Sequence, residues 1–286
     1  MTDLQSHQSQ LSRIAKHPLM TILISSVILI IATVAIKELV SKPLLRTIFT
    51  SDVIVKTITA LVGSLVMIVT YCKTVTYLEK KSTADFDLKM APKDLSKGLA
   101  LGVCAIGFTI LALYFMNYYN FIALMSPIDF MPTVAFIWGA AVLEEIIFRG
   151  LFFRLIYKWK GPIIALIVSS VMFQLPHFMN SHTGILPATL GVLFGVVAAL
   201  MYASTERLWA PIAFHFGWNI MQPAFGTTLS GVSEFTPLAE ATLSGPAVFV
   251  GSQFGIEVSI FSFFSLAILG AYYYYTLSKR GYFHQV

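Results

Sequence analysis

The chain has 286 residues, of which 57% are hydrophobic and only 12% are charged, and its formal net charge is +5. Because globular domains carry about a quarter charged residues, this composition argues against a large water-soluble enzyme, a disordered protein and a nucleic-acid-binding protein. We expect one integral membrane domain over residues 1–286, with the lipid bilayer as its partner. The sequence leaves the oligomeric state open.

Eight apolar segments follow one another along the chain. A spanning helix needs about 20 mostly apolar residues, and these segments cover residues 18–39, 53–78, 99–124, 133–157, 162–178, 185–203, 208–225 and 256–277. The fifth to seventh are short and interrupted by Gly and Pro, so seven spans are the alternative count. The predicted fold class is all-α, a polytopic membrane helix bundle with about eight transmembrane helices.

The basic residues predict the orientation of the bundle. With eight spans and a cytoplasmic N-terminus, 15 of the 19 Lys and Arg residues fall on the cytoplasmic side, among them Arg13, Lys16 and Lys81. The other four basic residues fall on the outer side and are called discordant below. They lie in and around the first outer loop: Lys37, Lys42, Arg46 and Lys56. The positive-inside rule therefore predicts that both termini face the cytoplasm.

The outer connection 222–255 contains Glu234 and Glu240 but no Lys or Arg. Its Ser, Thr and Gly content favours a flexible loop. The alternative is a lid over the site, which we favour less because the spans place the functional residues nearer the cytoplasmic side.

The fourth span carries three ionisable residues: Glu144, Glu145 and Arg149. Such residues are costly inside a membrane and indicate function by default. Glu145 and Arg149 are four apart on a helix, so they share a face and can form an ion pair. Glu144 points about 100° away and is left without that partner. The alternative is a cluster that only holds helices together. This alternative explains Glu145 and Arg149 better than it explains Glu144.

Two later spans add polar side chains. His177 directly follows Pro176, which disfavours regular helix at this point. His215 and Asn219 are four apart and share one helical face. Each histidine alone is more often structural, but together with Glu144 they give one carboxylate, two imidazoles and one amide.

This set of side chains favours hydrolysis of an acyl bond. A carboxylate and a histidine can hold and deprotonate a water, and burial makes the acid a better base. A second histidine and an amide supply donors for an oxyanion. No serine or cysteine lies in a recognisable nucleophile context, so we expect no covalent intermediate. We expect no cofactor; the alternative is a zinc ion held by Glu144, His177 and His215.

Three motifs occur in order: Glu-Glu-x-x-x-Arg at 144–149, Phe-x-x-x-His at 173–177 and His-x-x-x-Asn at 215–219. Together they resemble the CAAX protease and bacteriocin-processing family, which includes the type II CAAX prenyl endopeptidases. The resemblance covers a catalytic core of about 131–222. Pro176 is not required by the motif.

The resemblance implies a glutamate-dependent intramembrane endopeptidase. Glu144 with His177 would activate the water, His215 with Asn219 would stabilise the oxyanion, and a supporting group would shape the site: Glu145, Arg149 and Phe173. The implied substrate is a membrane-associated peptide or protein, either a CAAX-type C-terminus, a maturing peptide or a target of regulated proteolysis.

Two other functions stay open. One is a non-catalytic membrane scaffold or immunity protein with the same fold. The other is a proton-coupled transporter, because buried Glu and His also mark ion pathways; the missing inverted repeat argues against it.

Overall fold

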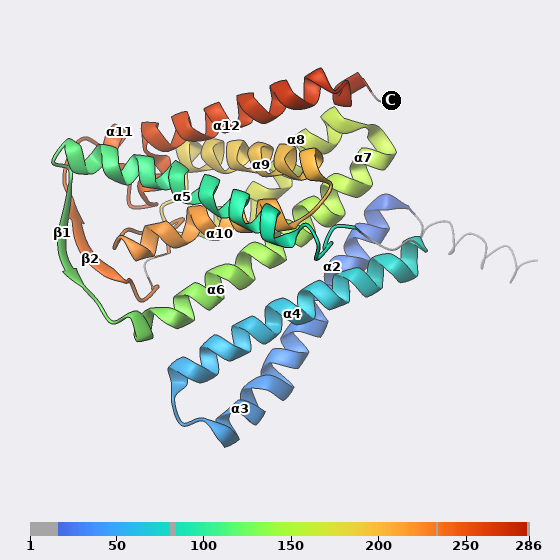
Figure 1. Ribbon diagram of the computed structural model, residues 1–286, viewed down its shortest axis with the longest axis horizontal. Helices are drawn as coiled ribbons and strands as arrows, with labels where there is room; N and C mark the ends of the chain where they lie inside the picture. Colours follow the sequence, from blue (N-terminus) through green and yellow to red (C-terminus); the bar gives the residue numbers. More distant parts are fainter. Residues whose placement is uncertain (1–16, 81–83, 233, 285–286) are drawn as a thin grey trace, which may run out of the picture.

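The computed structural model describes residues 17–80, 84–232 and 234–284, and it shows a bundle of helices with one two-stranded ribbon at its edge (Figure 1). Three members of the basic set, Arg13, Lys16 and Lys81, lie outside the described residues.

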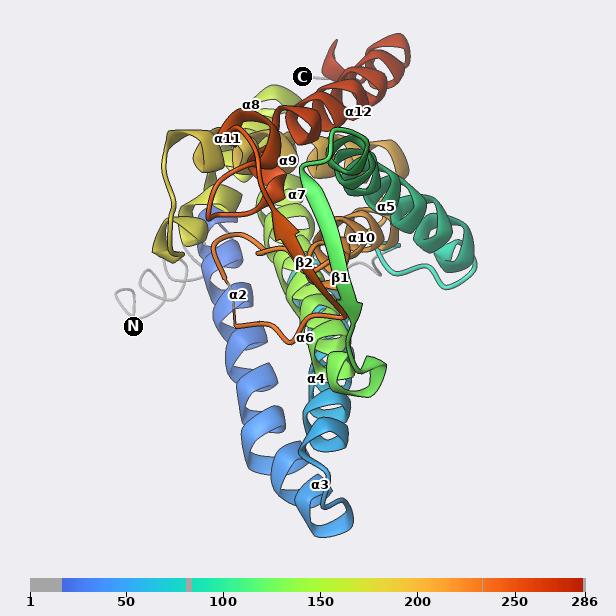
Figure 2. The same ribbon diagram turned by 90° about the vertical axis from the view of Figure 1, so that its left-hand side faces the viewer.

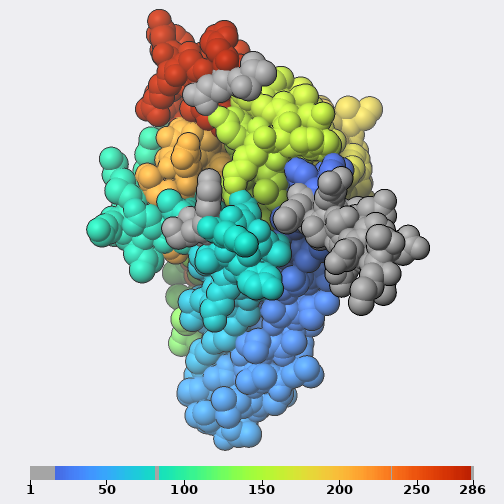
Figure 3. Space-filling model, turned by 90° about the vertical axis from the view of Figure 1, so that its right-hand side faces the viewer, coloured from blue at the N-terminus to red at the C-terminus, as the bar shows by residue number. Residues whose placement is uncertain are grey.

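The first two spans form a helical hairpin that projects beyond the rest of the molecule (Figure 3). Helix α2 (Pro18–Ala35) continues through a π-helical segment, η1 (Ile36–Ser41), into α3 (Lys42–Ile48). Helix α4 (Asp52–Glu79) then runs back along α2. Two of the discordant basic residues are paired with acids: Lys42 with Glu38 at 3.0 Å and Arg46 with Asp52 at 3.2 Å. These pairs give two of the four charges a partner, but the positive-inside rule counts Lys and Arg rather than net charge, so the outer segment still conflicts with the predicted orientation.

The remaining elements form the body of the bundle. In chain order these are α5 (Ala91–Phe115), β1 (Tyr119–Leu124), α6 (Pro127–Glu145), η2 (Ile146–Phe153), α7 (Arg154–Lys160), α8 (Pro162–Gln174), η3 (Leu175–Met179), α9 (Ile185–Thr205), α10 (Trp209–Ala224), β2 (Ala239–Leu243), α11 (Ala247–Val250), η4 (Ile256–Val258), α12 (Ile260–Lys279) and η5 (Tyr282–His284).

Seven helical segments among the described residues are long and apolar enough to cross a membrane: Pro18–Ile48, Asp52–Glu79, Ala91–Phe115, Pro127–Lys160, Pro162–Met179, Ile185–Thr205 and Ile260–Lys279. The predicted polytopic helical membrane bundle is confirmed. The remaining predicted span is α10, which has only 16 residues. At about 1.5 Å per residue it reaches roughly 24 Å, less than a hydrocarbon core of about 30 Å.

Helix α10 is buried inside the bundle. Eleven of its 16 residues are buried and the rest are partly buried, and it packs most extensively against α5. The two backbones approach closely because α5 carries glycine there: a side chain at Gly98 would collide with the Ala210 carbonyl, and one at Gly102 with the Phe214 carbonyl. Small residues at such crossings are typical of packed membrane helices.

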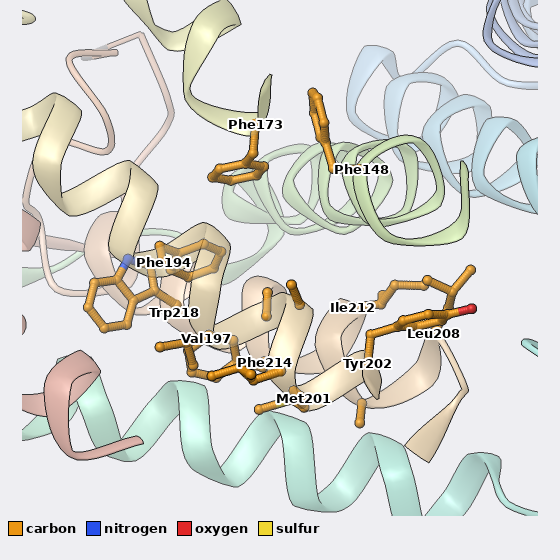
Figure 4. Packing of buried hydrophobic residues seen from close by; sticks show 14 of the residues in the cluster. Phe148, Phe173, Phe194, Val197, Met201, Tyr202, Leu208, Ile212, Phe214 and Trp218 are labelled. Atoms are coloured by element: carbon orange, nitrogen blue, oxygen red, sulfur yellow. The ribbon is translucent and has the colours of Figure 1, made fainter. Parts of the chain in front are cut away.

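The hydrophobic core around α9 and α10 is largely aromatic. Phe194 stacks on Phe214 with ring centroids 5.2 Å apart and meets Trp218 edge to face at 5.6 Å. Figure 4 shows this cluster and the neighbouring Phe173. The rings form a rigid wall beside the polar residues of the fourth, fifth and seventh predicted spans.

The ribbon corrects two predictions. Strand β1 pairs antiparallel with β2, from Tyr119 opposite Leu243 to Leu124 opposite Ala239 (Figure 2). The third span therefore ends at Phe115 rather than at residue 124, since Asn117 adopts a left-handed conformation with φ 59° and breaks the helix. The connection 222–255, predicted as a flexible loop, instead supplies β2 and the short helix α11.

Candidate active site

The carboxylate of Glu144 lies between two imidazoles. Its Oε2 atom is 4.0 Å from Nε2 of His177 and 4.0 Å from Nε2 of His215. These distances are too long for direct hydrogen bonds, and they suit a bridging water. Glu144 is the penultimate residue of α6, His177 lies in η3 and His215 lies in α10. Three separate elements therefore bring the carboxylate and the two imidazoles together. The Oε2 atom is buried and has no hydrogen-bond partner among the described residues.

Each imidazole is oriented through its Nδ1 atom. His177 Nδ1 lies 3.1 Å from the Phe173 carbonyl oxygen, and His215 Nδ1 lies 2.9 Å from Glu145 Oε1. Both of these oxygens are acceptors, so each Nδ1 carries the proton, and a neutral ring then presents the Nε2 lone pair to Glu144. Three acceptors facing a common point favour a donor such as water between them.

The position of His177 depends on a change of helix type. Helix α8 ends at Gln174 and continues as the 3-10 segment η3, which contains Pro176. The His177 ring reaches back to the carbonyl of Phe173 in the last turn of α8. This contact fixes the direction of the imidazole, which the sequence pattern left undetermined.

Glu145 and Arg149 form the ion pair that their spacing predicts. Arg149 Nη1 donates to Glu145 Oε1 at 2.9 Å, and both side chains are fully buried. Arg149 Nη2 also donates to the Gly195 carbonyl at 3.1 Å. Because Glu145 Oε1 is at the same time the partner of His215 Nδ1, the pair holds the His215 ring in place.

Phe173 touches most of the site. The guanidinium of Arg149 lies over its ring at 4.5 Å, and its centroid is 5.1 Å from His177 and 5.8 Å from His215. A guanidinium over an aromatic face is an attractive contact. Phe173 therefore packs the ion pair and both imidazoles into one unit, which fits the predicted supporting role.

A small cavity adjoins the two imidazoles. Its volume is about 30 Å³, and such a cavity holds a water from about 10–15 Å³ upward. Its walls are Phe173, Gln174, His177, Pro187, Leu190, Gly191, Phe194, His215, Trp218, Asn219, Ser230, Phe254 and Glu257. Asn219 therefore faces the same space as both histidines, whereas Glu144 reaches the imidazoles from outside this wall.

Glu257 is a buried carboxylate that the sequence motifs missed. It is 3% exposed and accepts hydrogen bonds from Trp218 Nε1 at 3.3 Å, Gln222 Nε2 at 3.2 Å and Ser230 Oγ at 2.7 Å. The sequence shows only an acid at the start of the last apolar segment, and this marks Glu257 as unusual. Its partners, and so its place beside the cavity, depend on contacts between helices that the sequence pattern does not contain.

The connection between α10 and α12 covers the site. Ser230 and Phe254 from this connection form part of the cavity wall, and Asn180, just after η3, donates to the Ser230 carbonyl at 2.9 Å. The connection therefore lies against the candidate site, which is the arrangement that the less favoured alternative of a lid requires. Because α9 begins beside this connection, its first turns, including Pro187, also line the cavity.

The described residues contain no group of three or more His, Cys, Asp or Glu placed to hold a metal ion. Zinc bonds of 2.0–2.2 Å in a tetrahedral site put the ligand atoms roughly 3.3 Å apart. The 4.0 Å separations between Glu144 and the two imidazoles are wider. The zinc alternative therefore requires these three side chains to move closer together.

Comparisons with known proteins match the part of the chain that carries this site. Residues 126–221 match the family model described as type II CAAX prenyl endopeptidase Rce1-like. A Bacillus subtilis (strain 168) protein named as a candidate membrane peptidase, YdiL, is 35% identical over 95 residues, which are 33% of this chain and 36% of that protein. The match thus spans little more than a third of the relative's length. No solved structure matches the chain.

The family match includes Glu144, His177, His215 and Asn219, and it ends before Glu257. Its limits, 126–221, lie close to the core that the motifs predict. Residues 126–221 are therefore similar to the Rce1-like type II CAAX prenyl endopeptidases, and the predicted resemblance to the CAAX protease and bacteriocin-processing family is confirmed.

Proposed function

We propose that the protein is a membrane-embedded endopeptidase that hydrolyses a peptide bond in a membrane-associated peptide or protein. The observation that carries this proposal is the Glu144 Oε2 atom, buried, unpartnered and 4.0 Å from both Nε2 atoms. The family match and the name of the Bacillus relative support the same class of reaction.

Glu144 and His177 would hold and activate the water. The water oxygen attacks the carbonyl carbon of the substrate while one of its protons passes to Glu144, which acts as general base. The carbonyl oxygen takes the electron pair of the double bond and becomes an oxyanion. When the carbon–nitrogen bond breaks, the leaving amine takes the proton from Glu144, and the products are a carboxylic acid and an amine.

His215 and Asn219 would stabilise the oxyanion. Donors directed at the charge that develops in the transition state are among the largest contributions to catalysis. His215 can donate from Nε2 when its ring is protonated, and Glu145, in contact with Nδ1 at 2.9 Å, stabilises that imidazolium. The buried Arg149 pairs with Glu145 at 2.9 Å and holds its carboxylate in position.

Substrate entry requires a wider site than the one described. The cavity of about 30 Å³ has room for a water, not for a peptide. The wall contributed by Ser230 and Phe254 belongs to a connection rather than to a spanning helix. We infer that this part of the wall moves aside when the peptide binds.

The test compares Glu144→Gln with wild type on purified protein in nanodiscs. The probes are quenched fluorescent peptides, one set with an apolar anchor and one with a farnesylated C-terminal cysteine. We expect kcat to fall by about 10²–10⁴-fold, the range for loss of a general base. Glu240→Gln is the matched control, because Glu240 is an exposed acid on β2.

Equal cleavage by wild type and Glu144→Gln would refute the proposal. Zinc measured by mass spectrometry, together with loss of cleavage on chelation and recovery on adding zinc, would favour the metal alternative. A cellular phenotype that survives Glu144→Gln, with no cleavage by wild type, would favour the scaffold function.

A further inference from the structure

We infer that the side-chain amide of Gln174 donates a hydrogen bond from Nε2 to the carbonyl oxygen of the bound peptide. This inference rests on the proposed function, and it adds a substrate-binding residue that lies outside the three motif positions. Gln174 is the last residue of α8, directly after Phe173.

Gln174 is buried yet incompletely bonded. It is 3% exposed, and its Nε2 atom has no hydrogen-bond partner among the described residues. A buried polar group without a partner costs free energy in the folded protein. A residue with this cost at the wall of a reactive cavity is suited to a ligand that supplies the missing acceptor.

The unpartnered polar atoms of the described residues separate into two groups. Five are hydroxyls, which can rotate to find a partner: Ser26, Thr33, Thr57, Thr59 and Thr183. The others belong to the site or to its neighbours: Glu144, Glu145, Arg149, Gln174 and Gln222. Within the second group, Gln174 is the residue that both lines the cavity and offers an unused donor.

The neighbouring α9 helix fixes the direction of the amide. Oε1 of Gln174 lies against Gly191, so closely that any Cβ at position 191 would overlap this oxygen. The Cα–H of a glycine can support a carbonyl oxygen at such an approach. Because Oε1 occupies this contact, Nε2 is the end of the amide that is left for a ligand.

Gln174 also lies close to His177 in the site. It is the last residue of α8, three residues before His177 in the 3-10 segment η3, and both residues line the cavity. The donor of Gln174 and the imidazole that would hold the water therefore belong to the same wall. As the water attacks, the carbonyl oxygen gains negative charge, and a hydrogen bond to it strengthens.

The experiment replaces Gln174 by Met, which has a similar length but no donor. The matched control is Gln253→Met, because Gln253 is exposed and lies outside the cavity wall. Three quantities are measured in nanodiscs: the unfolding temperature, its rise on adding an apolar tetrapeptide aldehyde, and kcat/KM for the peptides described above. The hydrate of the aldehyde carries a tetrahedral carbon with the oxygen in question.

We expect Gln174→Met to unfold at the same temperature as wild type or higher, because an unpaired buried donor is removed. We also expect it to lose most of the aldehyde-induced rise and about 10²–10³-fold in kcat/KM, the range for one oxyanion donor. Gln253→Met should match wild type in all three measurements.

A lower unfolding temperature for Gln174→Met would show that the amide is bonded in the resting protein, and this would overturn the inference. An unchanged aldehyde response in Gln174→Met, or none in wild type, would overturn it as well. Wild-type protein that responds to the aldehyde but cleaves no peptide would refute the proposed function and leave the amide contact supported.

Discussion

Gly191 faces the Gln174 amide so closely that even a methyl group would displace it. We predict that Gly191→Ala pushes the Gln174 side chain into the cavity and lowers kcat/KM at least about tenfold, since a misplaced donor loses its contact with the oxyanion. The measurement is peptide cleavage together with the unfolding temperature.

Gly184 provides the control on the same helix. It directly precedes α9, its φ of 175° is ordinary extended backbone, and a Cβ there would meet no atom within 4 Å. Gly184→Ala should retain wild-type activity. If both alanine variants lose activity equally, the start of α9 rather than the Gln174 contact is what matters.

Individual site residues differ in how far they could be predicted from the sequence. Glu144 stands out because it is an acid at membrane depth without a cation four residues away, and His215 and Asn219 because their spacing places them on one face. The importance of Gln174 depends on Gly191 in another helix, and the partners of Glu257 include Trp218. Contacts between helices leave no fixed spacing, so these two were not predictable.

At the scale of elements, the π-helical segment η2 is the link between the ion pair and the imidazole. It begins directly after Glu145 and contains Arg149, and π-helical turns occur often at functional sites. Its Gly150 carbonyl accepts hydrogen bonds from Tyr71 at 3.2 Å and Arg154 at 2.7 Å. These side chains give the irregular backbone a hydrogen-bonded carbonyl, while Glu145 and the Gly195 carbonyl hold Arg149.

We predict that Arg149→Met lowers the free energy of unfolding by about 3–5 kcal/mol, because it leaves the Glu145 charge buried without a partner. Adding Glu145→Gln should restore most of that stability while cleavage stays low, since a neutral amide does not stabilise the protonated His215 ring. Stability is followed by SDS titration and cleavage by the peptide assay. Recovery of both quantities together would mean that the pair serves stability alone.

The elements themselves show why some boundaries were predictable. Pro176 marks the end of α8, and the apolar lengths locate most spans. Strands β1 and β2 were not foreseen because each is five or six residues long and its partner lies more than a hundred residues away. The ribbon depends on that distant pairing, which the local pattern does not contain.

For the whole molecule, the basic residues predict that the ribbon and the C-terminal helix end on opposite sides of the membrane. Thr236, beside β2, and Lys279, at the end of α12, are both exposed. In a protein with Cys72 and Cys104 replaced by Ala, we expect Thr236→Cys to react with an impermeant maleimide on intact cells. Lys279→Cys should react only after the cells are opened. The reverse pattern would invert the predicted orientation.

The burial of α10 has a consequence for biogenesis. Its 16 residues are too few to cross the bilayer unaided, yet it carries His215 and Asn219. A segment this short is not expected to enter lipid by its own apolarity. We expect it to insert only together with α5, against which it packs most extensively, so that His215 reaches its place after the neighbouring helices have assembled.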